Sequence, residues 1–465
     1  MISLALLSKC QSIGKVVTLD GHLKFYTDSR KYKNPGAFVA IPGAKVNPLD
    51  MIDGLLKQGC PIVFYEQGPV NEGKVSELSG TYPHTLFIPV SQSITFLQEL
   101  THQHIKEWKN KNSRRIVFAI SGSNGKTTHK EMLSFILKEV LPGKVVSTEK
   151  NNNNHLGVPL TLLEVTDETE MVVLELGSNH PGEIKVLCDI AQPNAGLTTN
   201  IGATHMEFFG TEQKVFEEEA HLYHAVKHET SGQGFYLINL DDRYLKQLEP
   251  VHGSITYGES PSAMARVSYF DDGVEITFKA ESLVARNAQI TGRHNKGNLI
   301  TCLFIATHFY PDLKLPLIEA CKNFLPTKNR SEWIKFENRS VYLDAYNANP
   351  SSMKAALLGF KESVLAQGLM LNHACIVLGD MNELGDTTPE YHKEVGAYVQ
   401  ELGFVNVYFI GRFSIHYISG NPIGQPRIST AAFKSEYRNE CLPKYPIHFI
   451  KGSRSLQLES LFDIT

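Results

Sequence analysis

The chain has 465 residues, of which 42% are hydrophobic, 20% charged and 9% aromatic. At about 150 residues per domain, this length predicts about three domains. The composition is typical of a globular α/β protein and excludes a disordered, collagen-like or coiled-coil chain. Forty-five Lys and Arg residues against 49 Asp and Glu residues give a net charge of -4, which excludes the basic excess of a dedicated nucleic-acid binder.

The seven cysteines are scattered along the chain and never form a C-x-x-C pair. Their odd number and spacing argue against a disulfide framework or a structural zinc site and favour a reducing compartment. The sequence shows no export signal and no run of about 18 apolar residues. We therefore expect a cytoplasmic protein without a membrane span.

Residues 1–110 mix short apolar runs with turns, and the polar stretch at 102–115 indicates a helix tail and a linker. From Ile116 the pattern becomes strand, glycine loop and helix. Apolar runs at 172–176 and 195–201 then alternate with helical stretches. This rhythm predicts a domain with a parallel α/β sheet at 111–322.

The same alternation restarts near Pro326 and predicts a smaller α/β domain at 323–465. Its expected helices begin near Ser352 and Pro389. Its expected strands lie at 341–346, 375–381, 407–411 and 447–450.

The strongest motif is GSNGKTT at 122–128, which follows an apolar strand and opens an amphipathic helix. Glycines free backbone N–H groups to point at phosphate, and the helix adds its positive N-terminal end. Lys126 neutralises phosphate charge, and a threonine hydroxyl can hold Mg²⁺. The motif predicts a phosphate loop rather than a chance glycine turn, but an ATPase, a kinase and an ATP-driven ligase all fit this loop alone.

Two further polar residues follow apolar runs, namely Glu175 after 171–174 and His205 after 198–202. Both are therefore expected at the carboxyl ends of strands, where α/β sheets bind ligands. A carboxylate and an imidazole beside a phosphate loop are candidate metal ligands. For either residue alone, a solvated loop position is the alternative.

Many ordered motifs resemble the ATP-dependent Mur ligases, and most closely the branch that adds D-alanyl-D-alanine in peptidoglycan synthesis. The resemblance covers nearly the whole chain. In the middle it rests on ISGSNGKTT, the asparagine tract at 151–154, LELGSNHPGEI, TNIGATHMEFFG, NLDD and GRHNKGN. Toward the C-terminus it rests on PTKNRSE, DAYNANPSSM, LGDMNELG and KGSR.

The resemblance implies three domains: a small mixed α/β domain at 1–110 that binds the UDP-muramoyl-peptide, a P-loop ATPase domain at 111–322, and a Rossmann-like domain at 323–465. The last domain would close on ATP and bind the incoming dipeptide. The implied reaction uses ATP and Mg²⁺ to phosphorylate the carboxylate of UDP-N-acetylmuramoyl-tripeptide. The amine of D-alanyl-D-alanine then attacks the acyl phosphate. We expect a monomer with no nucleic-acid partner.

The resemblance also implies roles for individual residues. The catalytic residues would be Lys126, His205 and Glu219. Besides the phosphate loop, which is Gly122, Ser123, Asn124, Gly125, Lys126, Thr127 and Thr128, the ATP contacts would be Asn295, Arg330 and Asp344. Substrate contacts would be Ser29, Arg30, Asn153, Asn154, Tyr346, Asn347 and Asn349. The metal ligands would be Thr127, Glu175, His205 and Glu219.

Glu219 is the main departure from the family pattern, because it stands where Mur ligases usually carry a carbamylated lysine. Its carboxylate could replace the carbamate without CO₂, although the side chain is shorter. The alternative is a solvated helix face formed by Glu217, Glu218 and Glu219. His155 and His221 depart from the pattern as well, with surface or capping roles as the simpler interpretation.

The segment 43–50 lacks the glycine, aspartate and histidine typical of the family's first-domain loop. This difference leaves room for a Mur-type ligase with another acceptor or amine. A non-catalytic, nucleotide-dependent binding protein is the other alternative, motivated by Glu219. The complete phosphate loop together with Glu175, His205 and Arg330 argues against the binding protein.

Overall fold

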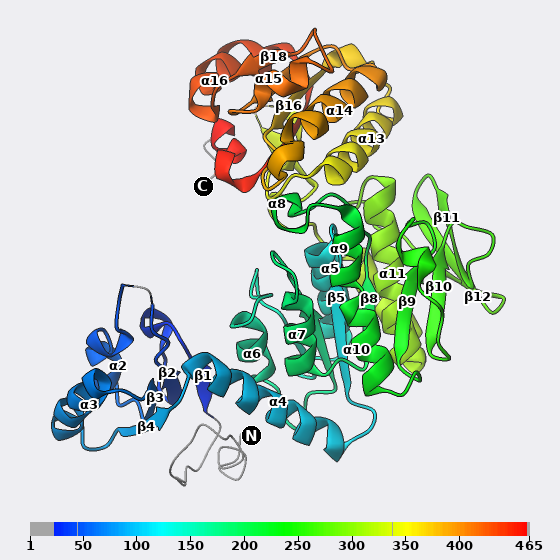
Figure 1. Ribbon diagram of the computed structural model, residues 1–465. Helices are drawn as coiled ribbons and strands as arrows, with labels where there is room; N and C mark the ends of the chain where they lie inside the picture. The colour runs from blue at the N-terminus through cyan, green and yellow to red at the C-terminus, as the bar shows by residue number, and fades with distance from the viewer. Residues whose placement is uncertain (1–22, 44, 337, 463–465) are drawn as a thin grey trace.

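The computed structural model describes residues 23–43, 45–336 and 338–462, and these form three sheets with their helices (Figure 1). The α/β fold class with three successive units is confirmed. In the described part of the chain, no helix is long and apolar enough to cross a membrane. The six cysteines in that part are buried free thiols, and Cys10 lies outside it.

The first sheet has the order β1–β2–β3–β4, and all its pairs are parallel. Its strands are β1 Lys24–Tyr26, β2 Gly36–Val39, β3 Ile62–Glu66 and β4 Leu86–Val90, and its helices are α2 Asp53–Lys57, α3 Pro69–Thr81 and α4 Ser93–Lys111. Buried residues alternate between its two faces: Phe64 packs on α4 and Val63 packs toward α2. Leucines of helix α6 Gly157–Leu162 and the turn beside it complete the core on the α4 side.

The central sheet has nine strands in the order β13–β12–β11–β10–β9–β8–β5–β7–β6. The strands are β5 Ile116–Ser121, β6 Val145–Ser147, β7 Met171–Glu175, β8 Ala195–Thr198, β9 Phe235–Asn239, β10 Ser254–Gly258, β11 Ala265–Phe270, β12 Gly273–Phe278 and β13 Glu281–Ala285. The strands from β6 to β11 are parallel, and β12 and β13 add an antiparallel edge.

Helices cover both faces of the central sheet because its strands bury residues on both sides. Phe118 and Ile120 pack against α5 Lys126–Val140, α11 Arg293–Phe309 and α12 Lys314–Lys322. Val117 and Ala119 pack against α6, α7 Glu183–Ala191 and α10 His221–Glu229. Strand β5 lies between β7 and β8. The strands β6 and β7 that follow it in the chain lie on one side of it, and β8 and β9 lie on the other, so the carboxyl end of β5 is a topological switch point. Such a switch point is where open α/β sheets bind ligands.

The last sheet has the order β14–β15–β19–β16–β17–β18, with β14 antiparallel and the other strands parallel. Its strands are β14 Glu332–Phe336, β15 Arg339–Asp344, β16 Ala374–Gly379, β17 Val407–Ile410, β18 Gln425–Arg427 and β19 Ile447–Lys451. Its helices are α13 Pro350–Ala366, α14 Thr388–Glu401, α15 Ser414–Ile418, α16 Thr430–Glu436 and α17 Leu442–Lys444. Ala203 and Met206 of the central unit belong to this unit's hydrophobic core, so the two units pack together.

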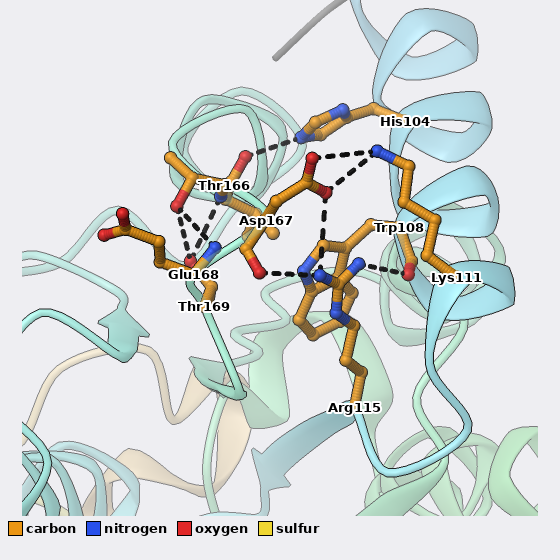
Figure 2. A network of polar contacts seen from close by, with 9 residues as sticks. His104, Trp108, Lys111, Arg115, Thr166, Asp167, Glu168 and Thr169 are labelled. Carbon is orange, nitrogen blue, oxygen red and sulfur yellow. Dashed lines mark hydrogen bonds and ion pairs between the residues drawn. The ribbon is translucent and has the colours of Figure 1, made fainter.

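Helix α4 connects the first sheet to the central unit and is fixed by a polar network at its C-terminal end (Figure 2). The buried Arg115 guanidinium donates to the carbonyl oxygens of Trp108 and Asp167, each at 2.7 Å. Lys111 pairs with the Asp167 carboxylate at 2.8 Å, and this contact lowers the pKa of Asp167. His104 contacts the Val165 carbonyl oxygen at 3.0 Å. Residues 102–111 of the expected helix tail and linker are therefore the last turns of the anchored helix α4, and residues 112–115 are a turn that leads into β5.

Candidate nucleotide-binding site

A cleft of about 1070 Å³ lies at the carboxyl ends of β5 and β7, where the central and last units meet. Loops of the central unit form one wall, and the segments that flank β15 and begin α13 form the other. The predicted site residues that line it are Ser123, Asn124, Gly125, Lys126, Thr127, Thr128, Asn153, Asn154, Glu175, His205, Asn295, Arg330, Asp344, Tyr346, Asn347 and Asn349.

The phosphate loop turns sharply between β5 and α5. Gly122 has φ +117°, and a Cβ atom there would lie 2.3 Å from Thr199 Oγ1, so only glycine fits. Gly125 has φ +79° and precedes Lys126, the first residue of α5. The N–H groups of the first turn of α5 have no partner within the helix, and the residues that carry them line the cleft. The loop thus forms an anion site from backbone N–H groups and the helix dipole.

The 199–202 loop supports the phosphate loop from behind. The Ser123 N–H donates to the Asn200 carbonyl oxygen at 2.8 Å. The Asn124 N–H and side-chain amide both donate to Asn200 Oδ1 at 3.2 Å. Asn200 was not singled out from the sequence, although it lies within the TNIG motif. The two loops follow different strands, so their pairing could be recognised only in the three-dimensional structure.

Glu175 is the buried carboxylate that faces the cleft. Its Oε1 atom accepts from Thr127 Oγ1 at 3.0 Å and from Asn153 Nδ2 at 2.9 Å. Its Oε2 atom is buried and has no hydrogen-bond partner. A buried carboxylate oxygen without a donor is costly unless a cation satisfies it. Thr127 and Glu175 therefore fit an Mg²⁺ ion beside the phosphate loop.

His205 is the N-cap residue of the short helix α8 Met206–Phe209 and has a left-handed backbone conformation, with φ +51°. Its Nδ1 atom lies 2.5 Å from Oε2 of Glu383, which belongs to the last unit. This close contact with His205 lowers the pKa of Glu383. His205 thus joins the central unit to the last unit beside the cleft, and its partner Glu383 lies within the GDMNELG motif.

Glu219 ends helix α9 Glu212–Glu219 and does not line the cleft. Its Oε2 atom accepts from the Gly122 N–H at 2.7 Å, and its Oε1 atom accepts from Ser178 Oγ at 3.2 Å. In the described part of the chain, no group of three or more His, Cys, Asp or Glu residues could hold a metal ion. The structure therefore does not gather Glu175, His205 and Glu219 around one metal position.

The last unit brings a second group of predicted residues to the cleft. The Arg330 guanidinium lies over the Tyr346 ring at 3.7 Å, a cation–π contact. Asp344 pairs with the buried Lys451 at 2.6 Å, and Lys451 also donates to the Asn347 carbonyl oxygen at 3.0 Å. Lys451 is the lysine of the KGSR motif, and its role was not anticipated from the sequence.

Asparagines at the cleft also shape the loops that carry them. Asn349 Oδ1 accepts from Ser352 N at 2.9 Å and caps helix α13. Asn154 Oδ1 accepts from the Gly157 N–H at 2.9 Å, before α6. Asn295 donates to the Thr291 carbonyl oxygen at 3.2 Å. Asn349 thus caps a helix and Asn154 orders the turn before one, and both still line the cleft.

Ser29 and Arg30 lie apart from these residues, in a short 3-10 helix of the first unit. Arg30 is exposed, and its guanidinium donates two hydrogen bonds to the Asp28 carboxylate, each at 2.9 Å. This pairing lowers the pKa of Asp28 to about 2. Neither Ser29 nor Arg30 lines the cleft, so their substrate roles stay predictions.

The strand order and the loop at its switch point define a P-loop nucleotide-binding α/β protein. Residues 120–306 match the family model for the Mur ligase middle domain, and residues 329–423 match that for the Mur ligase glutamate ligase domain. Together the two matches cover more than half of the chain. The chain belongs to the Mur ligase family.

Curated relatives and solved structures agree with this placement. The UDP-N-acetylmuramoyl-tripeptide--D-alanyl-D-alanine ligase of Bacillus subtilis is 29% identical over 94% of this chain and 91% of its own length. The Escherichia coli ligase of the same name is 28% identical over 96% and 94%. MurF from Acinetobacter baumannii superposes with a TM-score of 0.80 at 25% identity, covering 99% of this chain and 97% of its own.

Proposed function

We propose that the protein is an ATP-dependent, ADP-forming ligase that adds D-alanyl-D-alanine to UDP-N-acetylmuramoyl-tripeptide in peptidoglycan precursor synthesis. The observation that carries this proposal is the phosphate loop facing the unpartnered Glu175 oxygen in a cleft that the last unit covers. The names of the Bacillus subtilis and Escherichia coli relatives support the choice of substrates. Because peptidoglycan precursors and ATP meet in the cytoplasm, we place the reaction there.

The phosphate-loop residues bind and orient ATP. The N–H groups at the start of α5 and the Lys126 ammonium offset the charge of the phosphates and of the incoming carboxylate. Lys126 contacts the Gly122 carbonyl oxygen, so its ammonium already lies over the loop. Thr127 and Glu175 would hold Mg²⁺, which supplies further charge neutralisation when bound.

The chemistry proceeds in two steps. The tripeptide carboxylate attacks the γ-phosphorus of ATP, and ADP leaves as the acyl phosphate forms. The dipeptide amine then attacks the acyl carbon, an amide bond forms, and the bond from carbon to the phosphate oxygen breaks. Phosphorylation is needed because a carboxylate is a poor electrophile. The last unit packs against the 203–206 segment and so covers one side of the cleft in which the acyl phosphate would form.

The three units receive separate tasks in this proposal. The first unit would bind the UDP-muramoyl-peptide, with Ser29 and Arg30 available for its diphosphate because both lie on an accessible turn. The central unit would bind ATP. In the last unit, Arg330 and Asp344 would contact the nucleotide. The incoming dipeptide would contact Tyr346, Asn347 and Asn349 of the same unit.

One assay tests the function. Purified protein is incubated with ATP, Mg²⁺, UDP-N-acetylmuramoyl-tripeptide and D-alanyl-D-alanine, and phosphate release and product mass are measured. We expect phosphate release that depends on the dipeptide and a mass gain of one dipeptide residue. Lys126→Ala serves as the control and should abolish turnover.

Other outcomes of this assay would replace the proposal. Phosphate release only with another acceptor or amine would indicate a Mur-type ligase with different substrates. Nucleotide binding without any phosphate release would indicate a binding protein.

A further inference from the structure

The contacts of Glu219 differ from those expected of a metal ligand. Glu219 is 3% exposed and is not among the residues that line the cleft. Each carboxylate oxygen accepts a hydrogen bond, one from the Gly122 backbone and one from the Ser178 hydroxyl. Hydrogen bonds to a buried carboxylate stabilise its charged form, so a cation is not needed to satisfy it.

The backbone of Glu219 is held at the same place. Its carbonyl oxygen accepts from the Ser121 hydroxyl at 3.3 Å and from Thr198 Oγ1 at 3.5 Å. These hydroxyls belong to the ends of β5 and β8, which flank the switch point. The end of α9 is therefore fixed to the two strands that support the phosphate loop, and the carboxylate has one defined direction.

We propose that Glu219 is a positioning residue that orients the first peptide of the phosphate loop, and that it does not bind the metal. The Gly122 N–H donates to Glu219, while the Gly122 carbonyl oxygen accepts from Lys126. The N–H and the carbonyl oxygen of Gly122 belong to successive peptide units joined at its Cα atom. Fixing the first unit restrains the φ angle of Gly122 and, through it, the direction in which its carbonyl oxygen meets the Lys126 ammonium. The lysine is thereby kept over the phosphates, and the N–H groups of α5 are kept aimed at the cleft.

Glu175 provides the internal comparison. Both carboxylates are 3% exposed, but only Glu175 has an oxygen without a partner, and only Glu175 lines the cleft. The two glutamates thus have separate roles: Glu175 faces the cation position, and Glu219 holds the phosphate loop in its conformation. This inference rests on nucleotide binding by the loop, which the proposed function also requires.

Substitution by glutamine separates the two roles because it changes charge but keeps shape. In Glu219→Gln, the amide oxygen still accepts from Gly122, and the amide nitrogen donates to the Ser178 hydroxyl, so the tether survives. Glu219→Ala removes both contacts and leaves the Gly122 N–H buried without an acceptor. Glu217→Gln on the exposed face of α9 is the matched control.

The test measures ADP binding by calorimetry in EDTA and again across an Mg²⁺ titration, with thermal unfolding recorded for each variant. We expect Glu219→Ala to weaken ADP binding in EDTA by about tenfold or more, since a charge-assisted hydrogen bond is lost. We expect Glu219→Gln to stay within about threefold of the unmodified protein and to keep its Mg²⁺ dependence.

Two results would overturn the positioning role. One is a Glu219→Gln variant that needs about tenfold more Mg²⁺, because that is the loss expected when a ligand carboxylate is removed. The other is a Glu219→Ala variant that binds ADP normally in EDTA. If the unmodified protein itself failed to bind ADP, the proposed function would fail instead. Should the alanine variant not fold, the glutamine variant decides alone.

Discussion

At the scale of single residues, the oxygen of Glu175 that has no partner is the strongest indication of a cation site. Replacing Glu175 by glutamine keeps the acceptor for Thr127 and Asn153 and puts an amide nitrogen where the free oxygen lies. We expect Glu175→Gln to fold normally but to raise the Mg²⁺ concentration for half-maximal phosphate release by about tenfold or more. Glu168→Gln, at an exposed position, is the control. Equal Mg²⁺ dependence in both variants would exclude Glu175 as a ligand.

The residue types that carry chemistry could be predicted from the sequence because their motifs have local physical meaning. A glycine loop before a helix makes an anion site wherever it occurs, so Lys126 could be assigned from spacing alone, whereas Thr127 was assigned from the family resemblance. The partners of these residues could not be assigned in this way. Glu383 meets His205 because the central and last units pack together, and Lys451 meets Asp344 because β19 pairs with β15 in the last sheet. Glu219 could be recognised in the sequence as a departure from the family pattern, but its hydrogen bonds depend on the fold.

At the scale of elements, the regular strands and helices followed from hydrophobic patterning. The apolar runs near 116–120 and 375–381 are strands β5 and β16, and the helices expected near Ser352 and Pro389 are α13 and α14. The antiparallel edge formed by β12 and β13 was not anticipated. These two strands bury Val274, Ile276, Leu283 and Ala285 in the core beside α11, while other residues in them are half-buried or exposed, which is a weaker pattern than a fully buried strand.

Helix α4 is the element that sets the position of the first unit, and Arg115 fixes its C-terminal end (Figure 2). Arg115→Ala removes the donors to two carbonyl oxygens and the cation–π contact with Trp108. We expect a loss of about 2 kcal/mol in the free energy of unfolding, measured by urea denaturation. Arg114→Ala, at the exposed neighbouring position, should change this free energy by less than about 0.5 kcal/mol. Equal stability of the two variants would contradict the anchoring role.

At the scale of the whole molecule, the phosphate loop itself contacts the last unit. Asn349 Nδ2 donates to Asn124 Oδ1 at 2.6 Å, and Asn124 Nδ2 donates to Ser351 Oγ at 2.8 Å. Asn349→Ser keeps a residue that can cap α13 but is too short to reach Asn124. We expect this variant to open the cleft in solution, with a larger radius of gyration by small-angle scattering. Asn372→Ser, an exposed position in the same unit, should leave the scattering unchanged.

Nucleotide is expected to restore the closed arrangement in the Asn349→Ser variant, because ATP would bridge the central loop and Arg330 across the cleft. The same scattering measurement with ADP tests this. A radius that stays large with saturating nucleotide would show that the asparagine pair, and not the ligand, controls domain packing.

Buried histidines make the stability of the whole chain depend on pH. His392 shows the cause: its Nδ1 atom contacts the Thr388 carbonyl oxygen at 2.7 Å, and its Nε2 atom accepts from the Met381 N–H at 3.1 Å. Only the neutral ring satisfies both contacts, because a protonated Nε2 would point a hydrogen at another N–H group. Burial lowers the pKa of His392 to about 4.

The same direction and cause apply to His104, His129 and His448, each with a pKa lowered to about 4 by burial. Because the folded pKa lies below the unfolded value, the unfolded chain binds more protons between these values. Stability is therefore complete above the unfolded pKa of about 6.5 and is lost as the pH falls toward 4. Carboxylates with lowered pKa values, such as Asp28 at about 2, lose their contribution only at lower pH.

We expect the urea midpoint to fall when the pH is lowered from 7 to 5. The corresponding loss in the free energy of unfolding is about 2 kcal/mol for each of these histidines. His392→Gln should lower stability at pH 7 but flatten the dependence, since the amide offers both a donor and an acceptor and does not titrate. His84→Gln, at an exposed position, should leave the dependence unchanged. A urea midpoint that is constant over this range would show that the buried rings are protonated without cost. In that case, acid sensitivity would have to come from the carboxylates and begin at lower pH.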